Sequence, residues 1–130
     1  GAPEATAAYA AGFQRTTGGL HAAYDVFRRA VAALTEDEVA RLLDAGLLTP
    51  GAVSSATHQR MPALGPLDAV SVGIGVLKEP ALASRLGGAL ARMFAVLPLY
   101  RLYPESHDET ALRRWAWAAA RVGGWKADPV

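Results

Sequence analysis

The chain has 130 residues, no cysteine, and a formal net charge of +1 from 13 basic and 12 acidic side chains. The near-balance of charge argues against a dedicated nucleic-acid binder, which would carry a basic surplus. The absence of cysteine excludes disulfides, thiolate metal sites and cysteine nucleophiles within this chain. At this length we expect a single helical domain over residues 1–130, with loose ends at 1–3 and 126–130.

The spacing of apolar residues predicts an all-α fold, a compact bundle of about six short to medium helices. The first helix is expected over residues 4–15 and should fade at Thr16-Thr17-Gly18-Gly19. The second is marked by one apolar stripe with spacings of four and three residues: Leu20, Tyr24, Phe27, Val31 and Leu34.

A capping box at Thr35 and Glu38 predicts the start of the third helix, because each residue can bond the backbone N–H of the other. The helix should end at Gly46, a residue suited to the left-handed position after a helix. Its expected buried residues are Val39, Leu42 and Leu43. Thr49-Pro50 predicts a weaker helix over 51–60, ended by Pro62.

Residues 66–77 are apolar on every side of a helix, which predicts a buried helix. A buried strand is the competing interpretation, because four aliphatic residues between Val70 and Val76 alternate with serine and glycine. We prefer the helix, since no partner strand is predicted elsewhere and a lone strand is not stable.

The next helix is predicted over 80–97, closed by Pro98, with a stripe of Leu82, Leu86, Leu90, Met93 and Leu97. A second capping box, Ser106-His107-Asp108-Glu109, should start the last helix. That helix should end at Gly123-Gly124 and bury Leu112, Trp115, Ala119 and Val122.

No pattern of catalytic residues emerges. The three histidines, His21, His58 and His107, do not have the spacing of a zinc motif. The acidic pairs Glu36/Glu38 and Asp108/Glu109 are better explained by helix capping than by acid–base catalysis. We therefore expect no catalytic residue, metal site or cofactor, and favour a non-enzyme over a small helical enzyme with a site assembled across helices.

Two surfaces are candidates for protein contacts. Small residues recur four apart on the 80–97 helix, as Ala83, Gly87 and Ala91 and as Ser84 and Gly88, and would let two helices approach closely, within one chain or between subunits. On the last helix Arg113, Trp117 and Arg121 lie four apart, away from the apolar stripe. They have the composition of a contact hot spot, and equally of a surface tryptophan covered by arginines.

An apolar ligand pocket is the alternative function. Such pockets combine apolar walls with a few polar groups, and a quinone or lipid could be lined by Ile74, Phe94, Tyr100, Tyr103 and His107. The same residues could instead fill the core.

No signal peptide or membrane-spanning helix is predicted. The most apolar run, residues 64–77, covers about two-thirds of a bilayer span. We expect a cytoplasmic protein, with contact at a membrane surface left open.

The segment Leu77-Lys78-Glu79-Pro80-Ala81-Leu82, followed by Leu86-Gly87, resembles the L-K-D-P-x-V-x-x-x-L-G signature of the domain of unknown function 1641 family. The upstream Leu42-Leu43-Asp44-Ala45-Gly46-Leu47-Leu48 is similar to earlier helices of that family. The resemblance covers roughly a quarter of the chain. It implies a small helical protein encoded near formate dehydrogenase or quinone-linked flavoprotein genes, and it implies no catalytic residues.

These observations favour a non-catalytic helical accessory or scaffold subunit that acts by protein–protein association. The expected assembly is a homo-oligomer or a larger enzyme complex, with a redox complex as the setting that the resemblance implies.

Overall fold

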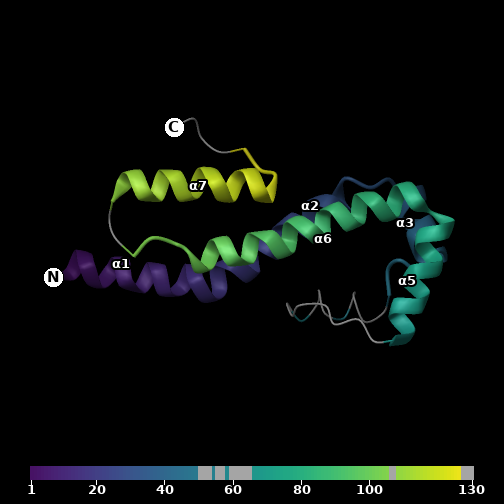
Figure 1. The fold of residues 1–130 in the computed structure, drawn as a ribbon, viewed down its shortest axis with the longest axis horizontal. Coiled ribbons are helices and arrows are strands. Elements are labelled where there is room, and N and C mark those ends of the chain that lie inside the picture. The colour runs from purple at the N-terminus through teal and green to yellow at the C-terminus, as the bar shows by residue number, and fades with distance from the viewer. Residues whose placement is uncertain (50–53, 55–57, 59–65, 106–107, 127–130) are drawn as a thin grey trace. The chain divides into compact units, whose positions relative to one another are not determined.

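The computed structural model describes residues 1–49, 54, 58, 66–105 and 108–126, and every regular element in these ranges is helical (Figure 1). The all-α class is therefore confirmed. The elements in chain order are α1 (Ala2–Phe13), the π-helix η1 (Gln14–Gly18), α2 (Gly19–Ala32), α3 (Glu36–Asp44), α5 (Pro66–Lys78), α6 (Pro80–Arg101) and α7 (Glu109–Gly123).

The chain divides into two compact units, each described here by itself. The first unit contains residues 1–27 and 90–130, and the second contains residues 28–89. Helices α2 and α6 contribute residues to both units. The helix expected over 51–60 lies outside the described residues, apart from Ser54 and His58.

The expected end of the first helix at Thr16–Gly19 is wrong. The chain passes instead through the π-helical turn η1 and continues directly into α2. Gly18 and Gly19 are both buried, and a Cβ added at Gly19 would lie 2.9 Å from the Cβ of Tyr100. These glycines are therefore used for close packing against α6, and they do not terminate the helix.

Small side chains dominate the buried positions of the first unit. On α2 the most buried residues are Ala23 and Val26, whereas the larger side chains of the expected stripe are half-buried. This pattern fits helices that approach closely at small residues and place larger ones at the edges of the contact. The buried apolar residues of this unit are Ala11, Ala23, Val26, Met93, Val96, Ala119 and Ala120.

In the second unit, α3 begins and ends as its sequence predicts. Thr35 and Glu38 form the capping box in full. At the other end Gly46 adopts a φ of +72°, and its N–H bonds the carbonyl of Leu43 while the N–H of Leu47 bonds the carbonyl of Leu42. This pair of bonds is a Schellman motif. Leu42 is buried as expected, Val39 is half-buried, and Leu43 is exposed, contrary to expectation.

Leu47 turns back from this motif into the core of the second unit. The core cluster consists of Leu42, Ala45, Leu47 and Leu82. Partly buried side chains pack around it: Leu34, Leu48, Val72, Ala83 and Leu86.

Helix α5 confirms the helical interpretation of residues 66–77, but the expectation that it is buried is wrong. Its inner side lies against the turn after α3, where the Ser71 hydroxyl donates to the Gly46 carbonyl at 3.4 Å. A Cβ added at Gly75 would lie 2.6 Å from the Ala45 carbonyl oxygen and 2.7 Å from Leu47 Cγ. Only a small residue fits at position 75. Of the aliphatic residues of α5, Val72 packs against the core cluster, and the others are left on the outer side.

Helix α6 does not end at Pro98, which lies inside it. Proline removes one backbone hydrogen bond from a helix, and two side chains from outside α6 donate to carbonyl groups of its last turn and of Tyr103, just after it. The Trp115 indole N–H donates to the Leu99 carbonyl at 2.8 Å. The Arg15 guanidinium donates to the Tyr103 carbonyl from Nε at 3.0 Å and from Nη2 at 2.7 Å. A cation at this end also suits the helix dipole.

Helix α7 is capped by Asp108, whose carboxylate accepts from the Thr110 N–H at 2.9 Å. The helix therefore starts later than the expected capping box, which begins at Ser106. Ser106 and His107 lie outside the described residues. The expected end is confirmed, with Gly124 at a φ of +76°. Trp125 folds over Gly123, where an added Cβ would lie 1.7 Å from the indole Cζ3.

A matched pair of substitutions on α5 tests the inner contact. Gly75→Ala places a methyl group against backbone and Leu47, and should lower the free energy of unfolding by about 1–3 kcal/mol. Gly73→Ala, on the same helix with no atom within 4 Å of the added Cβ, should raise it by up to about 1 kcal/mol through helix propensity. Urea unfolding followed by circular dichroism measures both. Equal effects of the two substitutions would contradict the contact.

Candidate functional site

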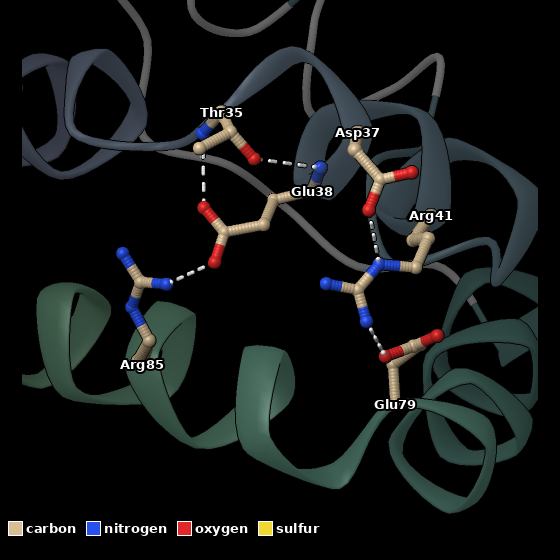
Figure 2. Close-up of polar contacts among 6 residues, drawn as sticks. All are labelled: Thr35, Asp37, Glu38, Arg41, Glu79 and Arg85. Atoms are coloured by element: carbon tan, nitrogen blue, oxygen red, sulfur yellow. Dashed lines mark hydrogen bonds and ion pairs between the residues drawn. The ribbon is translucent and has the colours of Figure 1, made fainter.

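Polar residues at α3 and at the start of α6 form two separate groups of contacts, which together we call the network (Figure 2). Glu38 uses both carboxylate oxygens: Oε2 accepts from the Thr35 backbone N–H at 2.9 Å, and Oε1 accepts from Arg85 Nη1 at 2.6 Å. The Thr35 hydroxyl in turn accepts from the Glu38 N–H at 3.2 Å. The helix cap of α3 is thereby joined to a side chain of α6.

Arg41 links α3 to Glu79, the residue that precedes α6. Its Nε lies 3.2 Å from Asp37 Oδ2, and its Nη1 lies 3.2 Å from Glu79 Oε2 (Figure 2). The Arg41 and Asp37 side chains are exposed, and the pair between them is worth only a few tenths of a kcal/mol in isolation. The network therefore fixes the orientation of α3 against α6 more than it adds stability.

Of the four acidic residues considered for catalysis, Glu38, Asp108 and Glu109 are engaged in structural bonds, and Glu36 is exposed. The Thr35 backbone N–H, with the Arg85 guanidinium, holds the pKa of Glu38 below its usual value against the opposing effect of burial. A carboxylate kept ionised in this way is a poor proton donor at neutral pH. On α7 Asp108 caps the helix and Glu109 pairs with Arg113.

The proposed ligand residues are only partly brought together. Tyr100 and Tyr103 meet Trp115 edge to face, with ring centroids at 4.9 Å and 4.7 Å. The two tyrosine rings thus pack around Trp115. Phe94, in the same unit, is exposed on α6, whereas Ile74 is an exposed residue of the second unit. His107 lies outside the described residues.

Tyr100 is held in its neutral form. Burial raises the pKa of its hydroxyl, and the nearby Asp25 and Tyr103 add to the effect. A phenol in this state can donate a hydrogen bond but is a poor general base at neutral pH. Its ring, packed against Gly19 and Trp115, has a structural role in the first unit.

The small residues of α6 do not form one packed surface within the chain. Ala83 packs against the core cluster of the second unit. Gly87, Gly88 and Ala91 are exposed, and a Cβ added at either glycine would meet no atom within 4 Å. Among the described residues of the second unit, close helix packing therefore does not account for these glycines. Contact with another chain stays a prediction.

The aromatic surface of α7 is partly covered by its own arginines. Arg121 lies over the Trp117 ring, with Cζ 5.0 Å from the centroid, and Arg113 pairs with Glu109. Trp117 is 48% exposed. This arrangement is the cation–π cover weighed from the sequence. It leaves part of the indole open to contact.

An exposed apolar surface on α5 was missed from the sequence, because α5 was expected to be buried. All exposed residues described between positions 66 and 77 are apolar: Pro66, Leu67, Ala69, Val70, Gly73, Ile74, Val76 and Leu77. Leu67 is 86% exposed, Leu77 83% and Val70 62%. We call these residues the outer face of α5. The signal for it was present in Ser71 and Gly75, which lie four apart and suit a close contact on the opposite side.

Helix α6 is long and apolar enough, by length and composition alone, to cross a membrane. The mostly buried core helix of a soluble protein passes the same test; α6 buries Leu82, Ala89, Met93 and Val96, but only 22% of its apolar 18-residue stretch is buried. Among the residues whose structure is described, no three histidine, aspartate or glutamate side chains lie close enough together to hold a metal ion.

The pKa of Glu38 gives the network a pH dependence. A carboxylate whose pKa is lowered by folding stabilises the protein above its unfolded pKa of about 4.3, and the stabilisation is lost as the pH falls through the folded value. Glu38→Gln should therefore lower the melting temperature at pH 7. The difference in melting temperature between this variant and the wild type should become smaller below pH 4. Glu36→Gln, in the same helical turn but exposed, is the control. A melting-temperature difference that is constant from pH 7 to pH 3 would contradict the stabilising role of the ionised Glu38 carboxylate.

Comparisons of the chain with protein-family models, with curated proteins and with solved structures found no match.

Proposed function

We propose that this chain is a non-catalytic helical subunit that acts by binding another protein chain, and that the outer face of α5 is its binding surface. The observation that carries the proposal is the exposure of this face. A contiguous apolar surface on a soluble chain favours association, because water is excluded when a partner covers it.

The contribution of such burial is substantial. Leu67, Leu77 and Val70 are each more than half exposed. Complete burial of a leucine or valine side chain stabilises by about 1.5–3 kcal/mol. Covering the three together would offset a large part of the entropy lost on association.

The structure of α5 shows why this apolar face does not fold inward. Gly75 and Ser71 lie against the turn at Gly46, and a Cβ at Gly75 would overlap with Ala45 and Leu47. The side of α5 that fits its own chain is therefore its small, partly polar side. The aliphatic side remains for a partner.

The setting within a redox complex rests on the resemblance of residues 77–82 to the family named above. Its first residue, Leu77, belongs to the outer face, and Glu79 bonds Arg41. An apolar quinone or lipid pocket is the less supported alternative, because Tyr100 and Tyr103 already pack on Trp115.

The test is the mass of the protein in solution, measured by size-exclusion chromatography with light scattering. Wild-type chain isolated from its native cell should run in a complex larger than its own 13.6 kDa. The double substitution Val70→Glu with Ile74→Glu should shift it to the monomer mass with unchanged helical circular dichroism, because charge on an apolar contact surface is costly to bury.

Tyr9→Glu is the matched control, since Tyr9 is 77% exposed on α1 in the other unit. It should leave the mass of the complex unchanged. A wild-type chain that is monomeric at every concentration and co-purifies with nothing would contradict the proposed function.

A further inference from the structure

The start of α6 is held to the second unit by contacts that continue as far as Leu86. Arg85 donates to the Glu38 carboxylate of α3 at 2.6 Å. Leu82 belongs to the core cluster, and Leu86 packs against that cluster. Polar and apolar contacts therefore both fix this part of the helix.

The next two residues, Gly87 and Gly88, make neither kind of contact. Both are exposed, and a Cβ added to either would have no atom of the described residues within 4 Å. Packing explains the buried helical glycines at 19 and 75, where an added Cβ would lie 2.9 Å and 2.6 Å from its nearest neighbour. Alanine would fit at positions 87 and 88, so the described packing does not require glycine there.

Two adjacent glycines weaken a helix locally. Glycine is the poorest helix former after proline, because a backbone without a side chain reaches many other conformations at low cost. Sharp bends in helices occur at such small residues. The pair lies in the interior of α6, more than one turn from Pro80 and from Arg101. It therefore does not serve as a helix end.

We propose that Gly87 and Gly88 form a hinge, at which the part of α6 after Gly88 bends relative to the part before Gly87. Hinges consist of a few residues, often small ones, that absorb the changes in φ and ψ. The boundary between the two units crosses α6 between residues 89 and 90, one residue after the pair. The core cluster and the bond from Arg85 to Glu38 involve only residues before the pair, so bending leaves them intact.

The other helix that joins the units, α2, can follow this bending at its end. It ends at Ala32, Ala33 lies in a turn, and both residues are exposed. Leu34 then packs against the same core cluster as Leu86. Each connection thus has one leucine fixed on the core, next to exposed residues without a large side chain. None of these residues belongs to the outer face of α5, so the hinge is independent of the proposed function.

Distances between pairs of spin labels test the hinge, because the chain has no cysteine of its own to interfere. Leu43→Cys and Leu102→Cys place labels on the two sides of the glycine pair, at positions that are 54% and 71% exposed. Tyr9→Cys with Leu102→Cys is the reference pair, since both positions lie in the first unit. Double electron–electron resonance should give a wider distribution of distances for 43–102 than for the reference pair.

The double substitution Gly87→Ala with Gly88→Ala should narrow the 43–102 distribution toward that of the reference pair, because alanine favours the helical conformation and its methyl group fits. Gly12→Ala is the matched control. Gly12 is also an exposed helical glycine with no described atom within 4 Å of an added Cβ. Its substitution should leave the width unchanged, and both variants should keep the helical circular dichroism of the wild type.

Three results would overturn the hinge. The first is a wild-type 43–102 distribution as narrow as that of the reference pair, which would show that α6 does not bend. The second is a wide distribution that the double substitution leaves unchanged, because the bending would then occur elsewhere in the chain. The third is equal narrowing by Gly12→Ala, which would indicate a general effect of helix stability.

Discussion

The contact between Gly75 and the turn after α3 determines which side of α5 is exposed in the second unit. Gly46 closes a Schellman motif, Leu47 enters the core, and the Ala45 carbonyl lies where a side chain at Gly75 would have to be. Only a small residue fits there, so α5 must place its small side inward. The aliphatic residues that elsewhere would form a core are thereby exposed. The proposed function depends on this steric constraint.

The first unit depends on close packing at small residues in the same way. Gly19 lies against Tyr100, and the Tyr100 ring meets Trp115 edge to face. The indole of Trp115 then donates to the Leu99 carbonyl, and Arg15 donates to the Tyr103 carbonyl. Aromatic and basic side chains thus satisfy the last turn of α6, a helix that continues past a proline. These residues have structural roles that account for them without a ligand.

Local signals in the sequence predicted local structure well. The capping box at Thr35, the left-handed glycine at Gly46 and the end of α7 at Gly124 are each set by a few adjacent residues, and the structure confirms them. The wrong predictions concern helix ends and burial that are determined by tertiary contacts. The buried glycines at 18 and 19 were interpreted as a helix end, because their partner Tyr100 is distant in sequence. Helix α5 was expected to be buried, since composition alone does not show which side its own chain can cover.

The central claim is that the outer face of α5 is open to solvent in the single chain and is covered on association. Methyl-group NMR of the wild-type protein with a soluble paramagnetic agent measures this directly. In the single chain the methyl signals of Val70, Ile74 and Leu77 should be strongly broadened, and the broadening should decrease once the chain is in its complex. Those of Leu42 and Leu82 should be protected throughout. Protection of Val70 and Leu77 at the lowest concentration would contradict the account.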